Sequence, residues 1–435
     1  MRVSISRRSS ASGHKKRCIV AFAMALASLP RRAHLGFTLD RVAGTADGRA
    51  LVIGGVRPGS SADLAGVLAG DRLLCFDGKR LTGSADVRNS ARGLAVGAHF
   101  ELVVERSGVE LTLSGVAIAL PTEEYSNARV LLEEVRAGDQ RLRAIVVLPE
   151  RPGPHPVVYY LPAAHWASEE YPFEPRHPVR ALIAALASAG FASVRVERSG
   201  MGDSVGPACN ELDFEAELHG YRSGLELVSR APWARADAIL LFGHSLGGML
   251  APLLARQQPV SGIAVFGTTA QRLQQSLVDA ARRRAMLRGL EGAKLSAFLE
   301  PLAELIELVI VEGLTPREAR ELRTDLRGVG TEWYIDDRVF DRSARFYQQL
   351  QTYDLEAVWK SVEPPVLALH GSADWVTTPQ DAQQIASVVG QRGTYQELPG
   401  VDHYLRSVVE GEPGDASPDL SNTVTSWFGE RLRVR

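Results

Sequence analysis

The segment Gly-His-Ser-Leu-Gly at residues 243–247 has the spacing G-x-S-x-G, which is typical of a serine nucleophile. An apolar run over 238–242 precedes it and predicts a buried strand, and an apolar run over 246–257 follows it and predicts a helix. In that setting the serine lies on a sharp turn, with glycines where side chains would collide. The start of the helix directs backbone N–H groups toward developing negative charge. A glycine-rich structural turn is the alternative, and the flanking elements favour Ser245 as a nucleophile.

A serine hydroxyl needs a general base, and the base needs an acid that orients it. His403 lies between the last predicted strand and the last predicted helix, where the base belongs if the chain order is serine, acid, histidine. Asp374 follows a buried-type strand over 366–369, and its carboxylate would fix the tautomer of the imidazole. Asp402 is the alternative acid, but neighbouring side chains on a loop generally point apart. The sequence therefore predicts Ser245, Asp374 and His403 as a catalytic set.

Attack on a carbonyl also requires N–H donors for the oxyanion. The N–H of Leu246, directly after the serine, is one expected donor. The other is expected on the loop that follows a strand over 157–161. Ala164 is the first choice there, and Ala163 is the second.

Strands and helices alternate from Arg129 to the end of the chain, after an initial hairpin. This alternation predicts an α/β fold with a mostly parallel sheet and helices on both faces. Residues 270–361 interrupt it with a helical pattern rich in Ala, Leu, Glu and Arg. We expect this insertion to be a lid over the catalytic edge, and a helical decoration that never moves is the alternative.

The segment 198–204, Arg-Ser-Gly-Met-Gly-Asp-Ser, resembles the glycine-rich loop that follows the fourth strand in the α/β-hydrolase superfamily. Together with the serine motif it extends this resemblance over residues 129–435. The resemblance implies hydrolysis of a carboxylic ester or thioester through an acyl-enzyme, on a small-molecule acyl substrate, with no metal or organic cofactor. The chain departs from the superfamily at its oxyanion loop, where Pro-Ala at 162–163 replaces the frequent His-Gly.

Two other functions stay open at this point. A serine peptidase of the same fold would use carboxylates to bind a peptide amine, and Glu169 and Glu170 are the candidates. A binding or scaffolding protein with an inactive hydrolase fold is the second alternative, and the intact set of serine, aspartate and histidine argues against it.

Residues 33–120 are predicted to form a separate, small, β-rich unit. Arg-Ser-Gly at 106–108 is expected to form a hairpin turn between two strands. One helix is expected over 85–92, with Ser84 as its N-cap and Gly93 as its end. Residues 121–128 combine proline with polar residues and predict a linker to the larger domain at 129–435.

The small unit resembles a PDZ domain. Arg-Pro-Gly-Ser-Ser-Ala at 57–62, Ala-Gly at 65–66 and Gly-Asp-Arg-Leu-Leu at 70–74 are similar to the central signature of that family. Leu-Gly-Phe at 35–37 is similar to its carboxylate-binding loop. The resemblance implies that a peptide or protein C-terminus binds at this loop and along an exposed strand edge. A β-rich spacer with no ligand is the alternative.

The residues expected at this peptide site are Leu35, Gly36, Phe37 and Val87. Arg31 and Arg32 lie just upstream and are expected to add positive charge to the site.

Residues 1–32 are predicted to be a leader. Several basic residues precede an apolar run over 18–26, and Ala-Leu-Ala at 25–27 gives a small-x-small pattern. This pattern predicts a secretory signal peptide cleaved after Ala27, and hence export; a disordered basic leader on a cytoplasmic protein is the alternative. The run is shorter than the roughly 20 residues of a membrane span, and no other segment is long and apolar enough for one.

The overall composition limits the partners. The formal net charge is −2, whereas nucleic-acid-binding proteins usually carry a clear basic excess, so no nucleic-acid partner is expected. The three cysteines are far apart and form no metal-ligand spacing, so neither a disulfide framework nor a zinc site is expected.

Overall fold

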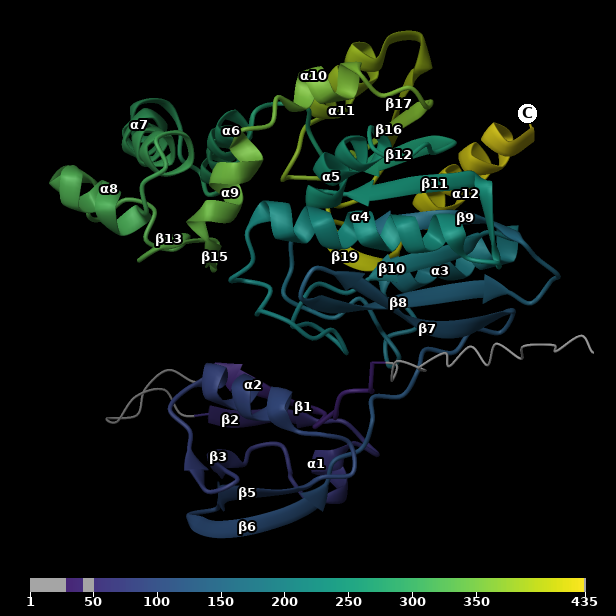
Figure 1. Ribbon diagram of the computed structural model, residues 1–435. Helices are drawn as coiled ribbons and strands as arrows, with labels where there is room; N and C mark the ends of the chain where they lie inside the picture. The colour runs from purple at the N-terminus through teal and green to yellow at the C-terminus, as the bar shows by residue number, and fades with distance from the viewer. Residues whose placement is uncertain (1–28, 42–50, 434–435) are drawn as a thin grey trace, which may run out of the picture.

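The structure is a computed structural model that describes residues 29–41 and 51–433 (Figure 1). Residues 1–28 of the predicted leader, which include Cys18 and the cleavage point after Ala27, lie outside the described residues. The described chain forms a small β-rich unit at the N-terminus and a larger unit built on a central sheet.

The N-terminal unit is an antiparallel sheet with the order β1-β2-β3-β5-β6, and β4 pairs with β3. Its strands are β1 (Phe37–Arg41), β2 (Leu51–Val56), β3 (Arg72–Phe76), β4 (Lys79–Arg80), β5 (His99–Arg106) and β6 (Val109–Val116). Two helices, α1 (Ser61–Leu64) and α2 (Ser84–Gly93), complete it. A separate apolar core, which includes Ile53, Phe76, Val87 and Leu102, holds the unit together. The expected hairpin turn is present between β5 and β6, with Gly108 at positive φ.

The expectation that Ser84 caps α2 is wrong. The N-cap is Gly83, and Ser84 is the first residue of the helix. The carboxylate of Asp86 instead accepts hydrogen bonds from the N–H and the hydroxyl of Thr82, so a first-turn aspartate ties the preceding loop to the helix. A negative charge in the first turn also suits the helix dipole.

The larger unit contains an eight-stranded sheet with the order β17-β16-β12-β11-β9-β10-β8-β7. Its strands are β7 (Ala128–Ala137), β8 (Gln140–Pro149), β9 (His155–Leu161), β10 (Ala192–Val196), β11 (Ala234–His244), β12 (Gly262–Phe266), β16 (Val366–Gly371) and β17 (Gly393–Leu398). The pairs β7–β8 and β8–β10 are antiparallel, and the other pairs are parallel. Parallel strands end at one edge, so the loops after β9, β11, β16 and β17 meet there.

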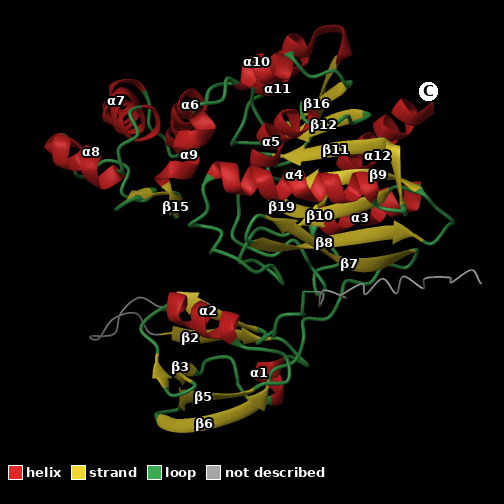
Figure 2. Ribbon diagram, viewed as in Figure 1, coloured by secondary structure: helices red, strands yellow, loops and turns green. Residues whose placement is uncertain are grey.

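Helices cover both faces of this sheet, as the sequence predicts (Figure 2). On one face lie α3 (Pro178–Ala189) and α12 (Pro418–Arg433), and on the other lie α4 (Phe214–Arg230), α5 (Leu246–Ala255) and α11 (Pro379–Val389). The central strands are apolar along nearly their whole length because both of their faces are buried. A short hairpin of β18 (Arg406–Val409) and β19 (Glu412–Ala416) follows β17 and was not predicted.

The chain between β12 and β16 forms a helical group beside the carboxyl ends of the strands (Figure 1). It contains α6 (Leu273–Leu287), α7 (Gly292–Ile306), a π-helical turn over Glu307–Val311, α8 (Pro316–Leu322), α9 (Ala344–Gln351) and α10 (Leu355–Lys360). The insertion is not wholly helical, because three two-residue strands form a small antiparallel sheet: β13 (Tyr334–Ile335), β14 (Arg338–Val339) and β15 (Arg342–Ser343).

Charged contacts join the segment before the N-terminal unit to the larger unit. The Arg31 guanidinium lies 2.7 Å from a Glu170 carboxylate oxygen and 2.8 Å from one of Asp203. The Arg32 N–H donates to Asp203, and the Arg32 guanidinium donates to the carbonyl of Ser204. The expectation that these arginines add charge to the peptide site is therefore wrong, because buried acids of the larger unit bind them.

Candidate active site

The turn between β11 and α5 holds Ser245 in a strained conformation. Ser245 has φ 53° and ψ −115°, a region that non-glycine residues rarely adopt. A side chain at Gly247 would collide with the carbonyl oxygen of Leu161 on β9, so only glycine lets the turn pack this closely. This sharp turn lifts the serine hydroxyl out of the sheet at the edge where the neighbouring loops meet.

The structure brings the three predicted side chains into one hydrogen-bonded row. His403 Nε2 lies 3.1 Å from Ser245 Oγ, and His403 Nδ1 lies 2.8 Å from Asp374 Oδ2. His403 and Asp374 are buried. The three residues come from the loops after β11, β16 and β17, which are remote in sequence and adjacent at the sheet edge.

The Asp374 carboxylate is fixed on both of its oxygens. Oδ1 accepts the N–H groups of Val376 (2.7 Å) and Thr377 (3.0 Å), and Oδ2 accepts the Thr377 hydroxyl (2.8 Å). Burial alone would raise the pKa of Asp374, but its bonds to His403 and Thr377 outweigh burial and hold the pKa below its usual range. The carboxylate is therefore charged at neutral pH and faces the imidazole.

The alternative acid, Asp402, faces away from this row. Its Oδ1 accepts the N–H groups of Tyr404 and Arg406, each at 2.9 Å, and its Oδ2 accepts the Arg406 guanidinium through Nε at 2.9 Å and Nη2 at 2.8 Å. These contacts close the loop that carries His403. Asp402 is thus placed to hold the loop rather than the imidazole.

Two residues near the row escaped the sequence analysis. The ring of His244 is buried, and its Nε2 lies 2.7 Å from the carbonyl oxygen of His403, which ties the serine turn to the histidine loop. Burial lowers the pKa of His244 to about 3, so the ring is neutral and donates to that carbonyl. Gly267 has φ +61°, and a Cβ there would lie 3.0 Å from both Asp374 Oδ2 and His403 Nδ1. The only sequence signal for Gly267 is a glycine directly after a buried strand.

Arg198 fixes the position of the loop that follows β9. Its Nη2 donates to the carbonyl oxygen of Ala163 at 2.7 Å, and its Nε donates to Glu217 at 3.1 Å. The Arg198 side chain is almost wholly buried. A trans peptide unit is planar, with its C=O and N–H pointing in opposite directions. Because Arg198 fixes the carbonyl of Ala163, the N–H of Ala164 points away from Arg198.

The candidate amine-binding carboxylates are already paired. Glu169 lies 2.9 Å from His165 and 3.5 Å from Arg198, and Glu170 binds Arg31. Both glutamates are buried. The alternative in which they hold a peptide amine is therefore disfavoured, because basic groups within the fold already pair with these buried carboxylates.

A pocket of about 450 Å³ opens onto Ser245 and His403 under the insertion. Ala163, Ala164 and Leu246 border it beside the serine. The rest of its wall is mainly apolar and aromatic, and its large side chains include Trp166, Met249, Leu277, Trp333, Phe340 and Trp375. Its size and lining suit an apolar organic group.

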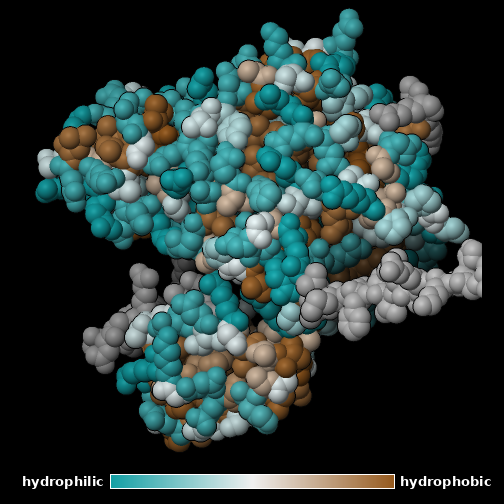
Figure 3. Space-filling view, in the orientation of Figure 1, coloured by the Kyte–Doolittle hydropathy of each residue, from teal (hydrophilic) through white to brown (hydrophobic). Residues whose placement is uncertain are grey.

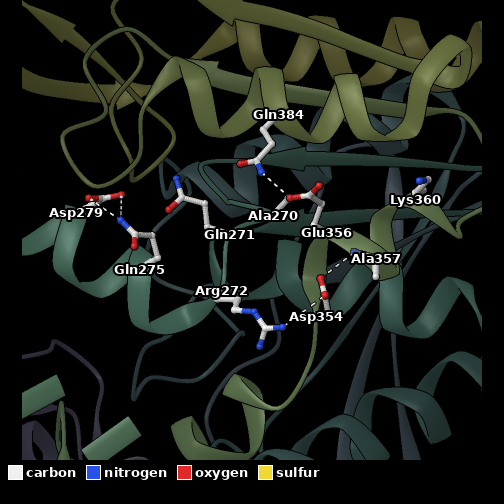
Figure 4. A pocket seen from close by; sticks show the side chains of 10 residues that line it. All are labelled: Ala270, Gln271, Arg272, Gln275, Asp279, Asp354, Glu356, Ala357, Lys360 and Gln384. Atoms are coloured by element: carbon white, nitrogen blue, oxygen red, sulfur yellow. Dashed lines mark hydrogen bonds and ion pairs between the residues drawn. The ribbon is translucent and has the colours of Figure 1, made fainter. Parts of the chain in front are cut away.

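A larger hollow, of about 790 Å³, lies at the base of the insertion and is lined mostly by polar and charged side chains (Figure 4). It contains none of the predicted catalytic residues. Its polar and charged groups contact one another: Arg272 faces Asp354 at 3.6 Å, and Gln384 donates to Glu356 at 3.1 Å. The first contact joins the two ends of the insertion, and the second joins α10 to α11; we assign the hollow no ligand.

The predicted peptide site of the N-terminal unit has the expected backbone form. Gly36 has φ +82°, and Phe37 begins β1, which pairs only with β2 among the described strands. Leu35 and Val87 are buried in the core of the unit, and Phe37 packs against it. A loop of the larger unit contacts the same region, since Phe173 stacks on His34 at 5.2 Å.

Within residues 29–41 and 51–433, no group of three or more His, Cys, Asp or Glu side chains is arranged to hold a metal ion. No helix in these ranges is long and apolar enough to cross a membrane.

Comparisons with known proteins agree with this architecture. The model of the alpha/beta hydrolase family matches residues 152–416, and the PDZ domain model matches residues 52–106. Esterase EstD of Thermotoga maritima is 20% identical over 238 residues, which cover 55% of this chain and 51% of that protein. The chain thus spans about half the length of this curated relative.

Similar folds occur among solved structures. Est1E of Butyrivibrio proteoclasticus with bound ferulic acid is 17% identical, with a TM-score of 0.47 over 69% of this chain and 99% of that chain. DcsB in complex with its substrate analogue is 18% identical, with a TM-score of 0.46 over 70% of this chain and 100% of that chain. The hydrolase model covers more than half of the sequence, and a PDZ domain precedes it. The chain therefore belongs to the alpha/beta hydrolase family.

Proposed function

We propose that this protein is a serine hydrolase that cleaves a carboxylic ester or thioester through an acyl-enzyme. The observation that carries the proposal is the row Ser245 Oγ, His403, Asp374, with spacings of 3.1 Å and 2.8 Å at the mouth of an apolar pocket. Such a row activates a hydroxyl that is otherwise a weak nucleophile.

In the proposed mechanism, Ser245 Oγ attacks the substrate carbonyl while its proton passes to His403 Nε2. Asp374 accepts the hydrogen bond from Nδ1–H and stabilises the imidazolium. The leaving alcohol or thiol then takes the proton from Nε2 as its bond to the carbonyl carbon breaks. Water repeats these steps on the acyl-enzyme, which releases the acid and restores the serine hydroxyl.

The N–H groups of Leu246 and Ala164 are the proposed oxyanion donors. Both residues border the pocket beside Ser245. Leu246 is the first residue of α5, where backbone N–H groups have no partner within the helix. The bond from Arg198 to the Ala163 carbonyl supports Ala164 as the second donor, and it makes Arg198 a positioning residue for that loop.

The substrate class follows from the pocket. Its apolar and aromatic wall suits an apolar acyl group. EstD is named as an esterase, which agrees with ester cleavage. No described carboxylate is free at the site to bind a peptide amine, which weighs against a peptidase.

The PDZ domain is proposed to bind a peptide or protein C-terminus. Its glycine turn at Gly36 and the open edge of β1 support this role, because a terminal carboxylate and an extended chain use such features.

The test compares hydrolysis of 4-nitrophenyl esters with hydrolysis of aminoacyl 4-nitroanilides by the full chain. We expect Ser245-dependent turnover of the esters and at least a hundredfold lower kcat/KM for the anilides. Preferential cleavage of the anilides would favour a peptidase. Turnover of esters that persists in Ser245→Ala would contradict the proposed nucleophile.

A further inference from the structure

The acyl pocket has one charged side chain in a mainly apolar wall. Among all the residues that line it, Arg284 is the only Asp, Glu, Lys or Arg. It lies near the end of α6, the first helix of the insertion. One face of α6 borders the pocket through Leu273, Leu277, Ala280, Ala281 and Arg284. This spacing is that of a helix face, so Arg284 belongs to the same wall as the apolar residues.

The Arg284 guanidinium has no acidic partner among the described residues. It stacks over the ring of Trp333 with 4.6 Å between the guanidinium carbon and the ring centroid. Glu332, the acidic residue beside that tryptophan, faces Arg288 at 3.8 Å instead. The neighbouring Arg283 is used elsewhere, since it donates to the carbonyl of Val376.

This arrangement leaves the N–H donors of the Arg284 guanidinium available to bind a ligand. A guanidinium stacked on an aromatic ring is held by its face and keeps its in-plane N–H groups free. Those groups match the two oxygens of a carboxylate. The hydroxyl of Thr268, another residue of the pocket wall, is buried and makes no hydrogen bond to the described residues.

We propose that the acyl portion of the substrate carries a carboxylate, and that Arg284 binds it. The substrate class is thus a monoester or monothioester of a dicarboxylic acid with an apolar middle. The reacting carbonyl lies at Ser245, the middle contacts the apolar wall, and the free carboxylate meets the guanidinium. This inference rests on the proposed serine hydrolase activity, because it assigns the substrate of that same site.

The test uses two esters that differ only at the far end of an eight-carbon acyl chain: mono-4-nitrophenyl suberate and 4-nitrophenyl octanoate. We expect the wild type to have the higher kcat/KM on the suberate monoester. Arg284→Met should lower kcat/KM for that ester by about 10- to 100-fold, mainly through KM, the effect typical of losing a charged hydrogen-bonded pair. Turnover of the octanoate ester should change by less than about threefold, because an apolar end makes no such pair.

Two further variants separate charge from shape and position. Arg284→Lys keeps the charge but not the planar fork, so its effect should fall between those of wild type and Arg284→Met. Arg282→Met is the matched control, because Arg282 is exposed on the same helix and does not line the pocket. It should leave the preference between the two esters unchanged.

The inference and the proposed function fail in different ways. If both esters are cleaved in a Ser245-dependent manner, and Arg284→Met leaves their ratio unchanged, the carboxylate site is wrong and the hydrolase proposal stands. If neither ester is cleaved, calorimetric binding of the suberate monoester to Ser245→Ala still tests Arg284. Weaker binding in Ser245→Ala/Arg284→Met would support the carboxylate site, and equal binding would overturn it.

Discussion

The two sides of the segment over 162–173 differ in what surrounds them. One side borders the acyl pocket, whose wall is mainly apolar and has a single arginine. The other side, which we call the charged junction, packs Arg31, Arg143, Arg198, Glu169, Glu170 and Asp203 together at low exposure. The pocket accepts an apolar group of variable shape, whereas buried ion pairs tolerate few arrangements. The charged junction thus holds the loop in one position. That position places Ala163 and Ala164 in the wall of the pocket.

The space-filling view shows the hydropathy of one outer face of the molecule (Figure 3). Hydrophilic side chains cover most of the face that it shows, with hydrophobic patches on the PDZ domain and on the insertion. Another ion pair lies inside the larger unit: Arg195 and Glu123, which tie the linker to β10, are both fully buried and lie 2.6 Å apart. The variants below separate the two regions, in order of their expected effect on kcat/KM.

The largest effect is expected from Asp374→Asn in the catalytic row. The amide cannot stabilise the imidazolium, so kcat/KM for a 4-nitrophenyl ester should fall about 10³- to 10⁴-fold, as in other enzymes with this set of residues. The melting temperature should change little, because the amide has the same shape. Asp402→Asn is the control and should lower kcat/KM less than about tenfold, since Asp402 contacts only its own loop. The assignment of the acid would be reversed if Asp402→Asn had the larger effect.

Arg198→Lys tests the residue that links the two regions. A lysine keeps the charge but cannot donate at once to Glu217 and to the Ala163 carbonyl in the same planar geometry. We expect kcat to fall about 10- to 100-fold with KM nearly unchanged, because an oxyanion donor acts in the transition state. A purely structural role would instead lower the fraction of folded enzyme and leave kcat per active site intact. Active-site titration distinguishes these outcomes.

Arg31→Ala should affect stability more than chemistry. It removes the cation that faces Glu170 and Asp203, whose side chains are 3% and 2% exposed, so two carboxylates lose a partner. The free energy of unfolding should fall by about 2–4 kcal/mol, with kcat/KM for a small neutral ester within about threefold of wild type. Arg176→Ala removes an exposed pair, with side chains 84% and 71% exposed, and should cost less than about 0.5 kcal/mol. Similar losses in both variants would contradict the role assigned to the charged junction.

Glu197→Gln gives the most pH-dependent effect, and it acts on stability. Burial raises the pKa of Glu197 to about 8, so the folded protein holds a proton that the unfolded chain releases near its ordinary value of 4.5. The contribution of this proton to the free energy of unfolding is fully present below pH 4.5. It falls by about 1.4 kcal/mol per pH unit between pH 4.5 and 8 and is lost as the pH rises through 8. Glutamine does not titrate, so the variant should gain stability relative to wild type over this range. Urea unfolding at several pH values measures the difference, and parallel pH profiles would show that Glu197 is charged in the fold.

The catalytic row was the part of the site that the sequence could indicate. Ser245, Asp374 and His403 each follow a strand with a strong apolar pattern, and strand order then brings their loops to one edge. The structure places the three side chains within hydrogen-bonding distance, and their catalytic roles remain a proposal. The hydrolase fold and the PDZ domain were likewise predictable, because apolar periodicity and glycine positions are local properties of the chain.

The charged junction could not be predicted in the same way. Arg31 and Glu170 are 139 residues apart, and neither has a local pattern that identifies its partner. Their charges therefore suggested ligand binding, whereas the fold pairs them with each other. The hairpin β18–β19 was missed for a related reason: its strands are short and mostly exposed, so they lack apolar alternation.

The central claim is tested most directly by labelling the full chain with a fluorophosphonate and locating the adduct by peptide mass spectrometry. The account predicts one adduct per chain, on the hydroxyl of Ser245, formed with loss of fluoride and absent in Ser245→Ala. An adduct on another residue, or a folded wild-type protein that stays unlabelled, would contradict it.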